Sequence, residues 1–431
     1  MIIKGTTILN YHNLTVEENR DLLIEDEKIK NIGNNLQEKG EIIDGRNFYC
    51  VPGLVNTHSH VAMTLLRGAA EDVNIDEWFN QYIWIYEKNL TPDDVYFGSL
   101  LGAAEMLQSG VTMVADHYFY MDRAFDAYKE IGIRANLGWA VFGFGEDSQE
   151  KFKRALEFTN KYLGKEKRID ISLAPHSPYL CPDEFLQKNV EVSKTLGIPL
   201  HIHVSEEHNQ LERSLKIRGI TPIEVLDKTG VLQKGTILAH AYYATDTDFD
   251  LIKTSGSGVA HCPKTYMKFG DNKNFLPRAL RKEINLGLGC DGPCSNNTIN
   301  IYEAARDAAL LAKLSERNAS NAKISELLPL LSGGGAKVLG LTNYGEIREG
   351  NIADLVLIKK NTPNMVPVNN IFANILYSLD RADVDTVIVD GRKVVEGGKI
   401  ISIDMEEVIR EINTRSARMT IRDSNLPMQN Y

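Results

Sequence analysis

Residues 51–68, VPGLVNTHSHVAMTLLRG, run a short apolar strand pattern into two histidines, His58 and His60, with one residue between them. Before this stretch, MIIKGTTIL and EIIDGRNFYC alternate apolar and polar positions between turn residues, which is typical of β-hairpins. After it, short apolar runs alternate with helical patterns to about residue 344. The stretch therefore marks the point where hairpin-rich structure gives way to repeated strand and helix.

Eight short apolar runs follow one another from residue 50, separated by amphipathic stretches. The stretches 121–132, 148–164 and 181–197 each end on a glycine, as helix C-caps often do. Strand followed by helix, repeated eight times, predicts a (β/α)8 TIM-like barrel over residues 51–344. The runs are CVPGLVNT, VTMVAD, IRANLGWAV, IDISLAP, IPLHIHV, GTILAH, SGVAHC and INLGLGC.

The alternation of apolar and polar residues that is typical of β-strands returns after about residue 344, in GEIREGNIADLVLIKK and VDTVIVDGRKVVEGGKII. Because the N-terminus shows the same pattern, we expect both chain ends to build one small domain of β-sandwich type beside the barrel. Residues 1–50 supply its first part, and residues 345–431 supply its second part and a helical tail. The predicted fold class is α/β, with the barrel as the larger unit.

Composition limits the classes of function. The 431 residues are 43% hydrophobic and 25% charged, as in a soluble globular protein, and 48 basic against 58 acidic residues argue against a nucleic-acid partner. No apolar run approaches the ~18 residues that span a bilayer, so we expect no membrane partner and a cytoplasmic protein. Five scattered cysteines without a CxxC pair argue against disulfides. A small-molecule partner is favoured, and a homo-oligomer stays open.

Six of the 10 histidines stand at or near the carboxyl ends of predicted barrel strands, the face that carries barrel active sites. Strand residues i and i+2 share one face about 6.6 Å apart, so two imidazoles at this spacing can converge on one ion at ~2.0–2.1 Å. One such pair is weak support, because isolated strand histidines are more often hydrogen-bonded core residues. The six are His58, His60, His176, His203, His240 and His261.

A second pair, in HIHVSEEH, places His201 and His203 on the fifth strand, with Glu206 in the loop that follows. His203 lies nearer the barrel mouth and is the preferred ligand, while His201 is expected to be a hydrogen-bonded core residue. Asp291 ends the eighth strand in LGLGCDGPCSNN, where an unpaired buried charge would be costly. Taken alone, Asp291 could equally serve a turn or a helix N-cap.

The motifs PGLVNTHSH, HVSE, LAHA, AHCP and CDGPCSNN, on strands one, five, six, seven and eight, together resemble the amidohydrolase superfamily. More narrowly, NIDEWFNQYIWIYEKNLTPDDV and APHSPYLC resemble its branch of methylthioadenosine and S-adenosylhomocysteine deaminases, with their triazine-hydrolase relatives. The resemblance covers nearly the whole chain, from DLLIEDEKIKNIG to GEIREGNIADLVLI.

The resemblance implies a metal site of His58, His60, His203 and Asp291. Three imidazoles and one carboxylate suit one Zn²⁺ per subunit, and Fe²⁺ is also acceptable. The fourth strand offers no lysine for a bridged pair of ions, which favours a mononuclear site. Bound zinc supplies hydroxide at neutral pH, with Asp291 accepting the water proton, Glu206 shuttling protons, and His240 orienting the hydroxide or stabilising an oxyanion.

The resemblance also implies that substrate contacts come from Trp78, Glu87 and His176, with Glu206 and Asp291 at the reacting centre. In the nucleoside deaminases the residue that corresponds to Glu87 holds the ribose diol. Without the resemblance, the aromatic residues of DEWFNQYIWIYEK would be assigned to a helix core face and Glu87 to a solvated charge. The roles of His117, His201 and His261 stay open.

The stretch after strand three, RANLGWAVFGFGEDSQEK, contains Trp139 and two phenylalanines where relatives that act on S-adenosylhomocysteine tend to carry arginines. Arg134 is too early in the chain and Lys151 is distant, so we expect the pocket around Trp139 to accommodate an apolar 5′ substituent more easily. The predicted activity is hydrolytic deamination of an adenosine-type nucleoside, namely 5′-methylthioadenosine, 5′-deoxyadenosine, adenosine or S-adenosylhomocysteine. The alternatives are deamination or dechlorination of another amino-heterocycle (triazine, guanine, pterin) and a non-catalytic barrel scaffold.

Overall fold

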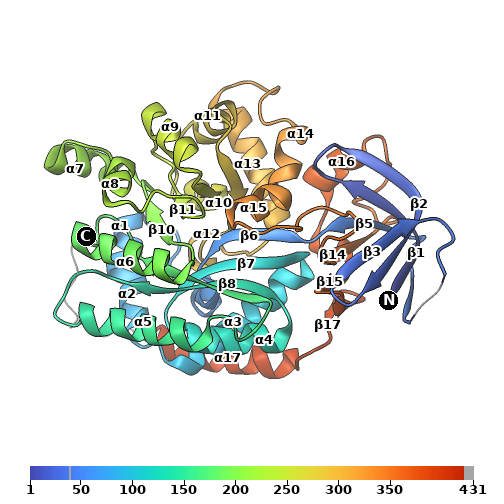
Figure 1. The fold of residues 1–431 in the computed structure, drawn as a ribbon, viewed down its shortest axis with the longest axis horizontal. Helices are drawn as coiled ribbons and strands as arrows, with labels where there is room; N and C mark the ends of the chain where they lie inside the picture. The colour runs from blue at the N-terminus through green and yellow to red at the C-terminus, as the bar shows by residue number, and fades with distance from the viewer. Residues whose placement is uncertain (38–39, 422–431) are drawn as a thin grey trace.

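The computed structural model describes residues 1–37 and 40–421. Its centre is a barrel of parallel strands, and each of the eight predicted apolar runs overlaps one barrel strand (Figure 1). The strands form two hydrogen-bonded groups of four, and single parallel bridges at Leu173–Leu200 and Ser59–Asp291 close both seams. The strands are β6 (Leu54–Ser59), β7 (Val111–Tyr118), β8 (Arg134–Val141), β9 (Ile169–Pro175), β10 (His201–Val204), β11 (Ile237–His240), β12 (Gly258–His261) and β13 (Asn285–Leu288).

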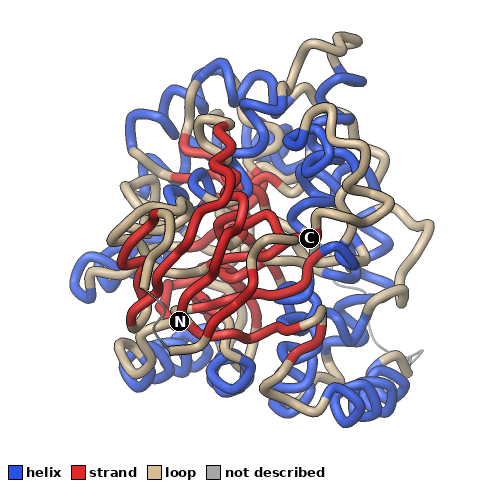
Figure 2. Tube along the Cα trace, turned by 90° about the vertical axis from the view of Figure 1, so that its right-hand side faces the viewer, coloured by secondary structure: helices blue, strands red, loops and turns tan. Residues whose placement is uncertain are grey.

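Helices follow the strands and form the outer layer of the barrel (Figures 1 and 2). Gly132 and Gly197 end two of them in left-handed conformations, with φ of 94° and 67°, as their positions in the sequence predicted. The main outer helices are α3 (Pro92–Gln108), α4 (Met121–Ile131), α5 (Ser148–Tyr162), α6 (Asp183–Leu196), α8 (Pro222–Thr229), α9 (Asp246–Ser255), α11 (Phe275–Lys282) and α13 (Ile301–Ser315).

Shorter helices lie at the barrel mouth and between the larger elements. Near the mouth are α1 (Ile75–Glu77), α2 (Trp84–Glu87), α7 (His208–Arg218), α10 (Pro263–Lys268) and α12 (Pro293–Asn296). The remaining ones are α14 (Ile324–Leu327), α15 (Gly333–Val338) and α16 (Ile371–Ala373). None of the helices in the described part of the chain is both long and apolar enough to cross a membrane.

The two chain ends share one nine-stranded sheet, in which β5 and β14 pair antiparallel with Val51 opposite Val356. The order is β17-β16-β15-β14-β5-β1-β2-β3, with β4 beside β1, so the predicted β-domain is one continuous hydrogen-bonded sheet with its own apolar core. The strands are β1 (Ile2–Asn10), β2 (Thr15–Glu25), β3 (Lys28–Gly33), β4 (Ile42–Asp44), β5 (Phe48–Pro52), β14 (Leu355–Lys359), β15 (Val384–Val389), β16 (Arg392–Glu396) and β17 (Lys399–Ile400).

The predicted helical tail contains α17 (Met405–Met419), and residues 422–431 of that tail lie outside the described residues. The helix leaves the sheet and runs beside α3 along the barrel (Figure 1). It buries Val408, Ile412 and Met419 in the core of the barrel. The chain therefore returns to the barrel after completing the sheet.

A buried ion pair joins the amino end of β8 to the sheet. Arg134 is 6% exposed, and its Nη2 lies 3.2 Å from Asp354 Oδ1 and 3.1 Å from Asp390 Oδ1. Tyr344 donates a further hydrogen bond to Asp354 Oδ2 at 2.8 Å. Arg134 is therefore fully engaged at the end of the strand opposite the barrel mouth.

Candidate active site

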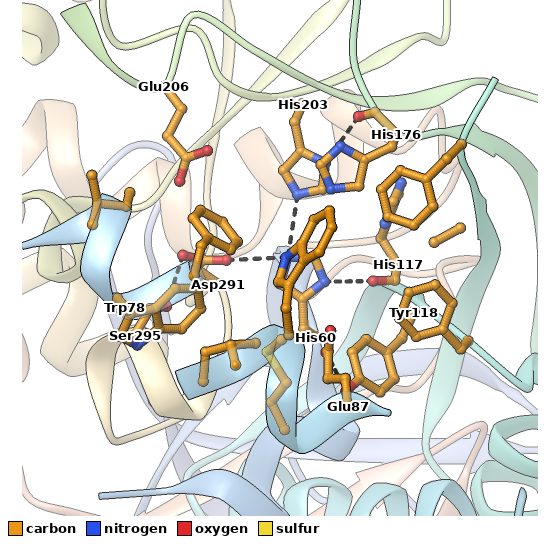
Figure 3. A pocket seen from close by; sticks show the side chains of 18 of the residues that line it. His60, Trp78, Glu87, His117, Tyr118, His176, His203, Glu206, Asp291 and Ser295 are labelled. Carbon is orange, nitrogen blue, oxygen red and sulfur yellow. Dashed lines mark hydrogen bonds and ion pairs between the residues drawn. The ribbon is translucent and has the colours of Figure 1, made fainter. Parts of the chain in front are cut away.

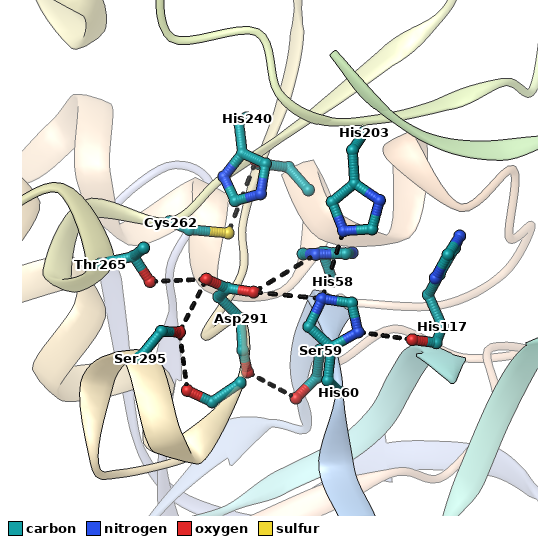
Figure 4. Close-up of polar contacts among 12 residues, drawn as sticks. His58, Ser59, His60, His117, His203, His240, Cys262, Thr265, Asp291 and Ser295 are labelled. Atoms are coloured by element: carbon teal, nitrogen blue, oxygen red, sulfur yellow. Dashed lines mark hydrogen bonds and ion pairs between the residues drawn. The ribbon is translucent and has the colours of Figure 1, made fainter. Parts of the chain in front are cut away.

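Five side chains from four strand ends approach one another at the barrel mouth (Figure 4). Ligating atoms of His58, His60 and His203 all lie within 4.8 Å of one another, and so do those of His58, His240 and Asp291. Asp291 Oδ1 is 3.3 Å from His60 Nε2 and 3.6 Å from His58 Nε2. The four ligands expected from the sequence are thus brought together, and His240 joins them.

Hydrogen bonds on the far side of each imidazole fix its orientation. His60 Nδ1 donates to the carbonyl oxygen of His117, and His203 Nδ1 donates to that of His176 at 3.1 Å. Because a carbonyl only accepts, both Nε2 atoms carry lone pairs when the rings are neutral, yet they lie 3.2 Å apart. Two facing lone pairs repel unless a cation lies between them, so this geometry fits a metal ion.

His58 is held in the same way by His201, whose Nε2 lies 2.8 Å from His58 Nδ1. The geometry agrees with the expectation that His201 is a hydrogen-bonded residue inside the barrel. Burial lowers the pKa of His58 to about 4, so its ring is neutral at physiological pH. Among the described side chains, the buried Nε2 atom of His58 has no hydrogen-bond partner, as expected of an atom that faces an ion, and His240 Nε2 has none either.

Asp291 supplies the negative charge of the cluster. Its Oδ2 accepts hydrogen bonds from Thr265 Oγ1 at 2.9 Å and Ser295 Oγ at 2.8 Å, which leaves Oδ1 facing the histidines. Burial would raise the pKa of Asp291, but His58 and His60 outweigh it and hold the pKa well below its usual range. Three imidazoles and one ionised carboxylate are a donor set that suits zinc.

The backbone is strained at three strand ends around this cluster. Ser205 after β10, His240 at the end of β11 and Asp291 after β13 have φ of 49°, 73° and 59°. Side chains other than glycine rarely adopt this region, and such strain persists where the surrounding structure holds it. Asp291 forms an isolated parallel bridge with Ser59 rather than a turn, and Gly292, not Asp291, is the N-cap of the next helix.

A pocket of about 660 Å³ opens over the histidines (Figure 3). It is lined by all five residues expected to contact substrate, namely Trp78, Glu87, His176, Glu206 and Asp291. His240 does not line the pocket; its Nε2 lies 3.6 Å from Glu206 Oε1, and its Nδ1 lies 3.3 Å from the Tyr266 hydroxyl. Burial and the neighbouring charge of Asp291 raise the pKa of Glu206 well above its usual value.

Glu87 and Trp78 form the side of the pocket that comes from the segment after β6. Tyr118 donates a hydrogen bond to Glu87 Oε1 at 2.6 Å, so Oε2 is left for a ligand. Burial raises the pKa of Glu87 to about 7 even though the Tyr118 bond lowers it. The indole Nε1 of Trp78 donates to the carbonyl oxygen of Cys294 at 3.3 Å, which fixes the ring as a wall.

The sequence-based placement of Trp139 in the pocket is wrong. Its ring packs against Phe158 and Tyr120, at centroid distances of 5.4 and 6.2 Å, while Ala140 and Phe142 line the cavity instead. β8 is largely buried along its length, so its sequence lacks the alternation that would show which side chains point inward.

One of the two phenylalanines of this stretch does line the pocket, since Phe142 stacks on His176 at a centroid distance of 4.9 Å. Sequence reasoning missed Tyr118, Phe119 and Trp84, which complete an aromatic wall. His117 also lines the pocket, whereas His261 is buried and stacks on Phe275 at 5.0 Å.

Comparison with known proteins identifies a family and several relatives of this chain. Residues 49–394 match the profile of the amidohydrolase family. The 5-methylthioadenosine/S-adenosylhomocysteine deaminase of Carboxydothermus hydrogenoformans is 39% identical over 427 residues, covering 97% of this chain and 98% of that protein. The 5′-deoxyadenosine deaminase of Methanosphaera stadtmanae is 38% identical over 416 residues, or 95% and 96% of the two chains. A zinc-bound adenosine deaminase structure from Xanthomonas campestris superposes with a TM-score of 0.92 at 27% identity, covering 97% and 98%.

Proposed function

Since this chain belongs to the amidohydrolase family, we propose that it is a zinc-dependent aminohydrolase that converts an adenosine-type nucleoside and water into the inosine analogue and ammonia. The observation that carries the metal assignment is the 3.2 Å approach of the Nε2 atoms of His60 and His203, both oriented by carbonyl groups. The names of relatives at 38–39% identity support the nucleoside substrate.

His58, His60, His203 and Asp291 would hold one Zn²⁺ per subunit. When bound, zinc lowers the pKa of water to about 7 and so supplies a nucleophile at neutral pH. Asp291 Oδ1 faces the same centre and can accept the proton that this water loses. His240 Nε2, buried and without a hydrogen-bond partner among the described residues, can donate a hydrogen bond that orients the attacking oxygen.

Glu206 is placed to carry protons to the substrate. Its carboxyl group lines the pocket beside Asp291, and its raised pKa favours the protonated form that a donor needs. It can give this proton to the ring nitrogen beside the amino-bearing carbon, and later pass a proton to the departing ammonia. Tyr179, whose hydroxyl accepts a hydrogen bond from the backbone N–H of Ser205, supports the loop that presents Glu206.

Glu87 is proposed to bind the ribose diol. Tyr118 already occupies Oε1, so the remaining lone pairs, chiefly those of Oε2, are available to the 2′ and 3′ hydroxyls. Trp78 and His176 line the same pocket and present flat rings to the nucleoside.

An apolar 5′ substituent fits this pocket better than an amino acid does. Phe142, Phe119 and Trp84 line it, and no lysine or arginine of the described residues does. Arg134 is engaged by two carboxylates at the opposite end of β8, and Lys151 pairs with Asp147 at 2.9 Å on an exposed helix. A zwitterionic homocysteine moiety would lose water without gaining a cation to meet its carboxylate.

Metal analysis and an ammonia-release screen test the proposal together. The purified enzyme should contain one zinc per subunit and release ammonia from 5′-methylthioadenosine, 5′-deoxyadenosine and adenosine. Turnover of triazines, guanine or a pterin instead of nucleosides would move the chain to another amino-heterocycle. Metal-free protein that turns over nothing, even after zinc is added, would favour a scaffold.

A further inference from the structure

We infer that the C-terminal helix α17 positions Glu87, and that Arg418 is the residue through which it acts. The inference rests on the proposed function only in assigning Glu87 to the ribose diol. The observation behind it is a set of hydrogen bonds between the last turn of α17 and the turn that immediately follows Glu87, although the two segments are more than 300 residues apart in sequence.

Arg418 contacts this turn with one end of its guanidinium and the start of α3 with the other. Nη1 donates to the carbonyl oxygen of Asn89 at 2.6 Å, and Nη2 pairs with Asp94 Oδ2. The Asn89 side chain donates hydrogen bonds in the opposite direction. Its Nδ2 lies 3.1 Å from the carbonyl oxygen of Met419 and 3.3 Å from that of Ile421. These bonds also satisfy carbonyl groups at the end of α17, which have no partners within the helix.

Backbone hydrogen bonds also join the 88–90 turn to the end of α2, the helix that carries Glu87. The N–H of Asn89 donates to the Tyr86 carbonyl at 3.0 Å, and the N–H of Leu90 donates to the carbonyl of Glu87 itself at 3.1 Å. On the other side, the Glu87 carboxylate is held by Tyr118. The backbone of Glu87 is thus fixed from α17 and its side chain from β7.

Asp94 anchors the same junction. It is completely buried near the start of α3, it closes a capping box with Thr91, and its carboxylate meets both Arg415 and Arg418. Arg415 Nη1 lies 3.1 Å from Asp94 Oδ1, and Arg415 also pairs with Glu411 on its own helix. No contact between Arg415 and the 88–90 turn is seen in the described residues, which makes Arg415 a matched control.

The test compares Arg418→Met and Asn89→Ala with Arg415→Met in the zinc-loaded full-length enzyme, using adenosine and 2′,3′-dideoxyadenosine. Misplacement of a binding group by ~1 Å can cost about 10²-fold, so the smaller displacement expected in Arg418→Met should raise KM for adenosine about 5- to 20-fold while kcat changes less than about 3-fold. For the dideoxy compound, which has no diol to lose, both variants should stay within about 2-fold of the wild type. Arg415→Met should leave the ratio of kcat/KM values for the two compounds unchanged.

Hydrogen–deuterium exchange over residues 84–94 supplies a readout that does not depend on turnover. Exchange should accelerate in Arg418→Met and Asn89→Ala more than in Arg415→Met. Unchanged exchange, or equal losses of kcat/KM for the two nucleosides, would overturn the inference. Failure of the proposed function would be visible in the wild type alone, as absent nucleoside turnover or absent discrimination between adenosine and its dideoxy analogue.

Discussion

Replacing Glu206 by glutamine should abolish most of the deamination rate while the metal stays bound. The amide keeps the size and shape of the side chain but cannot release a proton to the ring nitrogen. Positioned acid–base catalysis contributes ~10²- to 10⁴-fold, which is about 2.7–5.4 kcal/mol at ~1.36 kcal/mol per factor of ten. No other carboxyl group of the pocket is well placed to replace Glu206. Glu87 lies across the cavity in Figure 3, and Asp291 faces the histidines. We therefore expect the loss to fall in the upper half of that range.

The assay is steady-state ammonia release at saturating nucleoside, with zinc content measured on the same preparation. Glu206 is not among the grouped metal-binding side chains, so zinc should be retained. Glu207→Gln is the matched control, since Glu207 is the next carboxylate along the chain and does not line the pocket over the histidines. A Glu206→Gln enzyme with a kcat within a few-fold of the wild type, or a Glu207→Gln enzyme equally impaired, would refute the proton-shuttle argument.

His58→Ala should lower zinc occupancy and activity together, measured by elemental analysis, and a fully metallated, active variant would contradict the metal assignment. A 2′,3′-dideoxy nucleoside should lose on the order of 10² in kcat/KM because Glu87 Oε2 is left without the diol as a partner, and Glu87→Ala should narrow that gap. 5′-Methylthioadenosine or 5′-deoxyadenosine should show higher kcat/KM than S-adenosylhomocysteine in parallel assays, and the reverse order would reveal a cation that reaches the pocket. Arg134→Met should cost about 3 kcal/mol in denaturant unfolding, the low end of the ~3–5 kcal/mol for breaking a buried pair, because buried Asp354 loses its guanidinium partner while Asp390 keeps Lys167 at 2.9 Å.

The barrel and the family could be predicted from the sequence because each rests on local patterns. Short apolar runs separated by amphipathic stretches gave all eight strands, and two i, i+2 histidine pairs at strand ends located the mouth. The family match at residues 49–394 confirms the resemblance. Asp291 could be singled out because a carboxylate after an apolar run is costly to bury without a partner.

Other features depend on contacts that no local pattern encodes. Trp139 was misplaced because β8 is buried on both faces, and the side chains that point inward, Ala140 and Phe142, cannot be recognised by alternation. Tyr118 holds Glu87 at one side of the pocket, and α17 returns from the sheet to the barrel, both through bonds between residues far apart in sequence. Such long-range hydrogen bonds depend on how the closed barrel brings distant segments together, so residues adjacent in the sequence do not predict them.

The shared sheet has a consequence for how the chain folds during synthesis. β5 is completed by β14, which begins about 300 residues later, so at ~5–20 residues per second the first hairpins wait roughly 15–60 s on the ribosome for their partner. Throughout that interval β5 lacks its β14 neighbour and could pair with other nascent chains. We expect a chain cut before residue 355 to aggregate through this strand. Supplying residues 345–421 as a separate polypeptide should suppress that aggregation.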